Sequence, residues 1–179
     1  MDFSIFPQCV QNFYSGIQEN INEATHCIFE MEKTPGYCEY LLELLYSRPA
    51  DQIASFASTS LLNFVRKYWH NSDLFLQPKE NIYPTFLNIL FISNGVVRHI
   101  LTEAISLIVK ADFPEQWPNV FEILSQSIID HPIEQIELTL AVSNCIFKKI
   151  PIYSRKIPIY SSSSGSHPSG FGSTRPGRG

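Results

Sequence analysis

The residue types that most often perform chemistry are scattered along this chain of 179 residues and form no catalytic or metal-binding motif. The four cysteines lie at positions 9, 27, 38 and 145 without a CxxC pair, and the five histidines lie at 26, 70, 99, 131 and 167. No HExxH, GxGxxG or GxxxxGK[ST] pattern occurs, so neither a zinc site nor a nucleotide cradle is predicted. We therefore predict a binding protein that is not an enzyme and uses no metal or cofactor.

Charge is distributed unevenly along the chain. Residues 1–147 hold all seventeen acids and seven Lys and Arg, which gives this part a formal charge of −10. Residues 148–179 hold the other six Lys and Arg and no acid. An acidic body disfavours nucleic acid as a partner and favours a basic protein surface, although helical proteins are also acidic for solubility alone. No apolar stretch approaches the roughly 18 to 20 residues of a membrane span. No secretory signal is recognised, and unpaired cysteines favour a reduced, intracellular compartment.

The elements that position these residues are predicted to be helices. Gly and Pro, Pro84 among them, fall between apolar runs in residues 1–149, and no stretch alternates apolar and polar residues as a strand would. Helix caps are expected at Asp51 and at Ser93 or Asn94. From about Ser161 the chain is rich in Ser and Gly, and we expect residues 150–179 to form a low-complexity, disordered tail.

Internal repetition indicates the architecture. The patterns LLELL, FLNIL and VFEIL begin at Leu41, Phe86 and Val120, which are 45 and 34 residues apart. Between them recurs a second pattern that begins with Ala, at positions 24, 57, 104 and 141. Two alternating helix types at a period of about 40 residues predict a right-handed α-solenoid of about four HEAT-like helix pairs. A plain helical bundle is the alternative.

Helical wheels on the second helix type separate a core face from a polar stripe. On residues 50–69 the apolar residues, such as Ala57 and Leu61, gather on one side, and on 95–111 Leu101 and Ala104 do the same. We expect the opposite, polar sides to line a binding surface. Arg66 would bind a partner there, or would instead face an acid within the solenoid or cap the end of its own helix through the macrodipole. The candidate residues are Gln52, Ser55, Thr59, Asn63, Arg66, His99, Thr102 and Ser106.

Three segments, in order, resemble the amino-terminal region of the importin-beta (karyopherin) family of nuclear transport receptors, and within it the importin-alpha re-export (cellular apoptosis susceptibility) branch and related importins. LLNFVRKYW is similar to a family element through Asn63 and Trp69, with Leu62 in place of a Lys, and SNCIFKK resembles a fourth-repeat element. The segment AISLIVKADFPEQWP is the most specific. Its matching residues include Ala104, Ile105, Ser106, Ile108, Asp112, Phe113, Pro114, Trp117 and Pro118, with Glu103 replacing Asp.

The resemblance covers about residues 1–150 and implies four HEAT repeats whose inner helices bind the GTP-bound small GTPase Ran. It also implies importin-alpha or other protein cargo, nuclear pore proteins in a full-length receptor, and a location in the cytoplasm, nucleus and nuclear envelope. The alternatives are a HEAT-repeat scaffold unrelated to transport and a non-functional truncated gene product. After Lys149 the family pattern gives way to a KIPIYS repeat, so a fragment or an altered gene model is expected.

Two further expectations concern packing. Trp117 lies between Pro114 and Pro118 and is predicted to be buried against the preceding helix pair. The final helix, about 133–149, carries several apolar residues that a fifth pair would cover in a longer receptor, so we expect an exposed apolar patch there.

Overall fold

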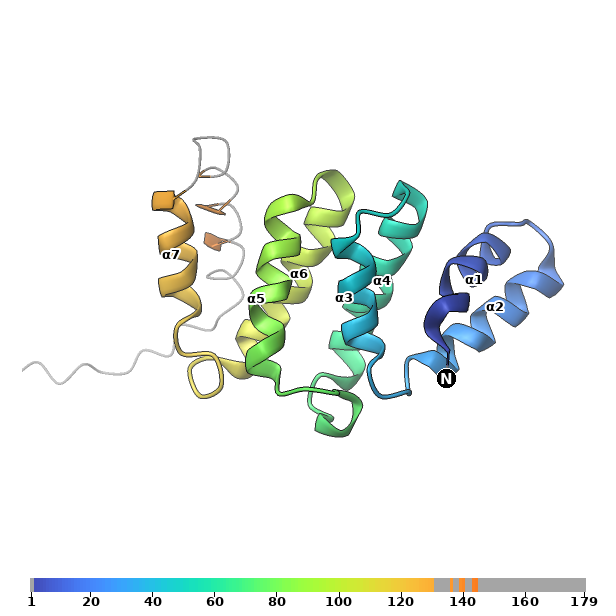
Figure 1. Ribbon diagram of the computed structural model, residues 1–179, viewed down its shortest axis with the longest axis horizontal. Helices are drawn as coiled ribbons and strands as arrows, with labels where there is room; N and C mark the ends of the chain where they lie inside the picture. The colour runs from blue at the N-terminus through green and yellow to red at the C-terminus, as the bar shows by residue number, and fades with distance from the viewer. Residues whose placement is uncertain (1, 131–135, 137–138, 141–142, 145–179) are drawn as a thin grey trace, which may run out of the picture.

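The computed structural model describes residues 2–130 together with 136, 139–140 and 143–144, and residues 2–130 form helices without any strand. The helices follow one another as antiparallel pairs stacked side by side (Figure 1). This confirms the predicted all-helical repeat fold. The bounds are η1 (Phe3–Ile5), α1 (Phe6–Phe13), α2 (Gln18–Met31), α3 (Tyr37–Tyr46), α4 (Asp51–Tyr68), η2 (Ser72–Leu74), α5 (Lys79–Ile92), α6 (Gly95–Asp112) and α7 (Val120–Asp130).

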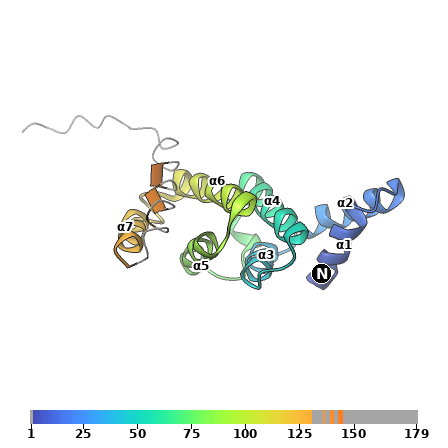
Figure 2. The ribbon, with the colours of Figure 1, turned by 90° about the horizontal axis from the view of Figure 1, so that it is seen from above.

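The helices are arranged in two layers, as Figure 2 shows from above. Helices α1, α3, α5 and α7 form the first layer, and α2, α4 and α6 form the second layer. Helices α4 and α6 pack against each other more extensively than α3 and α5 do, so the middle of the second layer is closely packed. The helix expected to pair with α7 and the apolar patch expected on 133–149 lie mostly outside the described residues. The tail from residue 150 lies wholly outside them.

The repeated patterns form the core between the layers. Leu41, Leu42 and Leu45 of α3 are buried, and so are the Leu and Ile residues of the corresponding pattern in α5. Ala57 and Ala104, which begin the second pattern, are fully buried on α4 and α6. A small side chain at these positions allows neighbouring helices to approach closely, which agrees with the extensive α4–α6 contact.

Two local expectations, for Pro84 and Asp51, were wrong, and the helix start expected at Ser93 or Asn94 is confirmed at Asn94. Pro84 does not break a helix but lies inside α5, where burial of Tyr83 and Phe86 on either side outweighs the loss of one backbone hydrogen bond. Asp51 lies in the first turn of α4, after the capping position. Asn94 occupies the capping position of α6 without a side-chain capping bond, and Ser93 ends α5 by donating its hydroxyl to the carbonyl of Ile89.

Gly36 lies where α3 begins. Its φ of +90° lies in the left-handed region, and a Cβ built there would lie 2.6 Å from Cδ1 of Leu76. The Gly36 amide donates a hydrogen bond to the carbonyl of Leu74 at 2.9 Å, which fastens the loop before α5 to the start of α3. The positive φ favours glycine here, whereas the exposed Leu76 side chain could rotate away from a Cβ.

Candidate protein-binding surface

A buried carboxylate holds together the helices that carry the candidate surface. Asp112, at the end of α6, is 1% exposed, and its Oδ2 accepts hydrogen bonds from Nε1 of Trp69 at 2.7 Å and from the hydroxyl of Tyr83 at 2.8 Å. Trp69 ends α4 and Tyr83 belongs to α5, so one oxygen connects three helices. Hydrogen bonds to an ionised acceptor are among the strong ones, and they set the relative positions of α4 and α6.

Trp117 completes this cluster. Its indole is 2% exposed and stacks on the ring of Tyr83 with centroids 4.3 Å apart and 7° between the planes. The main-chain carbonyl of Asp112 accepts from the amides of Gln116 and Trp117, which forms the turn between α6 and α7. The predicted burial of Trp117 against the preceding helix pair is confirmed. Of the other family-like residues of this turn, Phe113 is half-buried, and Pro114 and Pro118 are exposed.

The environment of Tyr83 keeps its hydroxyl protonated. Burial raises the pKa of the phenol well above its ordinary value, and the hydrogen bond to the Asp112 carboxylate raises it further. The hydroxyl therefore remains a donor over the physiological pH range. In addition, the ammonium group of Lys79 lies 4.7 Å from the ring centroid of Trp69, which places a positive charge over this indole.

Most of the predicted polar stripe lies on the second layer, on α4 and α6. Gln52 lies near the start of α4 and Arg66 near its end, about 21 Å away along the helix at 1.5 Å per residue. The stripe is therefore an elongated surface. Among its residues, those exposed are Gln52, Thr59, Arg66 and His99, and those half-buried are Ser55, Asn63 and Thr102.

Ser106 does not belong to this surface. Its side chain is fully buried, and its hydroxyl donates to the carbonyl of Thr102 at 2.7 Å in the same helix. The wheel placed it on the polar side because it treated α6 as having one buried face, whereas α6 also buries Ile105 and Val109. Thr59 and Thr102 likewise donate to carbonyls of their own helices, so these hydroxyls present only acceptor lone pairs to a partner.

Arg66 faces an acid within the solenoid, which is one of the alternatives that the sequence left open for this residue. Its guanidinium donates to Oε1 of Glu103 on α6 at 2.8 Å, and the two side chains are 49% and 35% exposed. An ion pair this exposed contributes little to stability, about 0–1 kcal/mol. Its effect is to orient Arg66 across the α4–α6 boundary. The sequence drew attention to Glu103 only as a replacement for Asp in the family-like segment.

The centre of the second layer is not acidic, contrary to the expectation from the overall charge. Helices α4 and α6 together carry four Lys and Arg, whereas the acids they expose are Asp51 and the half-buried Glu103, because Asp112 is buried. Most acids of the described helices lie on other elements, for example Glu39 and Glu43 on α3. The net charge of the chain therefore does not describe the charge of this surface.

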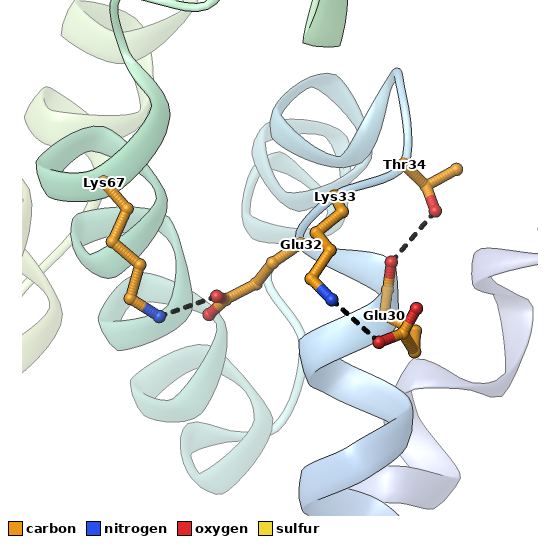
Figure 3. Close-up of polar contacts among 5 residues, drawn as sticks. All are labelled: Glu30, Glu32, Lys33, Thr34 and Lys67. Atoms are coloured by element: carbon orange, nitrogen blue, oxygen red, sulfur yellow. Dashed lines mark hydrogen bonds and ion pairs between the residues drawn. The ribbon is translucent and has the colours of Figure 1, made fainter.

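A second cross-helix ion pair joins the end of α2 to α4, within the second layer (Figure 3). The Lys67 ammonium lies 2.8 Å from Oε2 of Glu32, whose side chain is 7% exposed, at the end of α2. Beside it, Lys33 pairs with Glu30 at 2.9 Å on the surface of α2 (Figure 3). The buried position of Glu32 was not predicted, because nothing in the spacing of the acids distinguishes it from its exposed neighbours.

Two general properties of the described residues bear on function. Within them, no three His, Cys, Asp or Glu side chains are grouped as metal ligands would be. None of the helices described has both the length and the apolar character needed to cross a membrane. The features of the described surface that remain to be interpreted are therefore its helix faces and the grooves between them.

Comparison with known proteins gives one informative similarity. The chain is 25% identical over 112 residues to a curated protein described as an importin beta-like SAD2 homolog, from Arabidopsis thaliana. The match covers 59% of this chain and 11% of the plant protein, so the chain spans a small part of that relative's length. No protein-family model matches the sequence. The similarity agrees with the importin-beta resemblance at the coarse level and does not distinguish branches within that family.

Proposed function

We propose that this chain is part of a nuclear transport receptor of the importin-beta type, and that its second layer binds the GTP-bound form of Ran. The observation that carries the proposal is the similarity to an importin beta-like protein. The stacked helix pairs and the Asp112 cluster support it, because they place the family-like residues in a rigid framework behind an exposed polar face. Transport of importin-alpha or other cargo belongs to the same proposal.

The proposed surface runs along α4 and α6. The exposed Gln52, Thr59 and His99 and the half-buried Asn63 offer hydrogen-bonding groups, and Arg66 adds a charge already oriented by Glu103. A partner could bind across both helices without a large rearrangement, because the Trp69–Asp112 bond holds their ends together. Such preorganisation reduces the entropic cost of association. Ran would carry its own nucleotide, so this chain needs no cofactor.

The test is the affinity for Ran loaded with a non-hydrolysable GTP analogue and for Ran loaded with GDP. We expect at least tenfold tighter binding to the GTP form, which corresponds to about 1.4 kcal/mol. Replacing Asn63 and Arg66 together by Glu should weaken binding about tenfold, since it removes a positive charge and adds two negative charges at the Arg66 end of the stripe. The matched control is Glu43→Arg on α3, in the first layer, which should stay within about twofold of the wild type.

Two outcomes contradict parts of this proposal. Equal binding to both nucleotide states, or binding to neither, removes Ran recognition and favours a nucleotide-independent helical scaffold. Nucleotide-dependent binding that the double variant leaves unchanged, in a folded protein, moves the Ran surface away from α4 and α6. Circular dichroism and thermal unfolding of each variant separate these outcomes from loss of fold.

A further inference from the structure

A small basic pocket lies between the last turns of α4 and α6, on the second layer. Its volume is about 300 Å³. Val65, Trp69 and Leu107 supply apolar walls, and Arg66, His70 and Lys110 supply the polar rim. This volume is at the lower end of ligand pockets, about 300 to 1,000 Å³, and suits a side chain better than a cofactor.

The formal charges at the pocket, those of Arg66 and Lys110, are both positive. Arg66 lies in the last turn of α4 and His70 follows just beyond the end of that helix, while Lys110 lines the same pocket from α6. Among the residues that the structure describes, no carboxylate lines the pocket. Glu103 is engaged by Arg66 outside the lining, and the Asp112 carboxylate is buried with Trp69 and Tyr83 as its donors. Within the described residues, His70 and Lys110 take part in no ion pair.

The helix macrodipole accounts for part of this arrangement but not for all of it. Bases in the last turn of a helix are favourable on their own, because the C-terminal end carries partial negative charge. Lys67 occupies the same last turn of α4, yet it turns towards α2 and pairs with the buried Glu32. Arg66 and His70 instead converge with Lys110 on a hollow with apolar walls. Apolar walls lower the local dielectric and strengthen the attraction of these groups for an anion.

We infer that this pocket binds an acidic side chain, Asp or Glu, of a protein partner lying across α4 and α6. The carboxylate would accept hydrogen bonds from the Lys110 ammonium and the His70 imidazole. Arg66 has five N–H donors and only one is used in its bond to Glu103 Oε1, so it can contribute to the same carboxylate. The inference does not require that the partner be Ran, and it holds for any protein with an acidic segment of suitable shape.

The test uses the whole chain and a capped Asp-Glu-Asp-Glu peptide as the probe, with the capped Asn-Gln-Asn-Gln peptide as its neutral counterpart. In a ¹⁵N-¹H NMR titration at low salt, we expect the acidic peptide to shift the Trp69 indole and the amides of His70 and Lys110 saturably, with a Kd of about 1 mM. The neutral peptide should cause no such shifts. Arg66→Gln and Lys110→Gln should each weaken binding at least threefold, on the scale of a partly exposed charge pair.

Lys67→Gln is the matched control, because it removes the same charge from the same helix turn but outside the pocket. Its effect should stay below about twofold. Equal losses from Lys67→Gln and Lys110→Gln would show a diffuse electrostatic attraction and overturn the inference. It would also be overturned by equal binding of the two peptides, or by no saturable shift up to about 10 mM. Lys110 is exposed, so the Lys110→Gln variant should fold, and its circular dichroism spectrum verifies this.

Discussion

The ring of Tyr83 stacks on the indole of Trp117 with only 7° between their planes, although the two residues belong to different helix pairs. The same tyrosine donates its hydroxyl to Asp112, which also accepts from Trp69. Stacking and hydrogen bonding therefore converge on one side chain at the junction of the second, third and fourth repeats.

Replacing Trp117 by Ala should lower the free energy of unfolding by about 3–5 kcal/mol, because it removes a large buried ring and leaves a cavity beside Tyr83. Urea denaturation followed by circular dichroism measures this loss. Pro118→Ala, at an exposed neighbouring position, is the control and should change stability by less than about 0.5 kcal/mol. An unchanged urea midpoint for Trp117→Ala would contradict the packing described for this residue.

Replacing Asp112 by Ala should destabilise the protein more than replacing it by Asn. Alanine leaves the Trp69 N–H and the Tyr83 O–H buried without an acceptor, at about 1–3 kcal/mol for each donor. Asparagine keeps one side-chain oxygen and can still accept from one or both. Comparison of the two unfolding free energies is the measurement, and equal values would show that the carboxylate does not hold the two donors.

The stability of the protein should fall as the pH rises above about 10, in part because of Tyr83. A tyrosine in the unfolded chain ionises near its usual pKa of about 10, whereas burial raises the pKa of Tyr83 in the folded protein. The unfolded state therefore loses the proton first, so the stabilisation is present below pH 10 and is lost as the pH rises towards the folded pKa. Burial of Tyr37 acts in the same direction.

Urea unfolding at pH 8 and at pH 11 measures this dependence. Tyr83→Phe should show a smaller fall in stability between the two pH values than the wild type, even though its stability at pH 8 is lower. Tyr37 is present in both proteins and cancels in the comparison. Parallel falls for the two proteins would mean that Tyr83 ionises alike in the folded and unfolded states.

Replacing Lys67 by Gln should cost about 1–3 kcal/mol, because it leaves the nearly buried Glu32 carboxylate without its cation. Lys33→Gln breaks the neighbouring pair with Glu30, whose side chain is 42% exposed, and should cost less than about 1 kcal/mol. Changing both Glu32 and Lys67 to Gln should recover part of the loss, since no buried charge then remains. Equal effects of Lys67→Gln and Lys33→Gln would contradict the difference in burial between Glu32 and Glu30.

Much of the fold could be predicted from the sequence because it depends on periodicity. The repeated apolar pairs and the recurrent Ala define helices whose one face must be buried, and a period of about 40 residues is sufficient to predict stacked pairs. The burial of Trp117 followed from its type and its flanking prolines. The polar stripe on α4 was located by the same wheel, since α4 has a single well-defined polar side.

Tertiary structure decided the features that depend on which residues meet across helices. Ser106 is buried because α6 packs on more than one side, which a wheel of one helix does not contain. The pairing of Arg66 with Glu103 and of Lys67 with Glu32 joins residues 37 and 35 positions apart, and their side chains have no periodic relation in the sequence. Local sequence determines which face of a helix is apolar, but only the packing of neighbouring helices determines which charges are paired and which remain available to a partner.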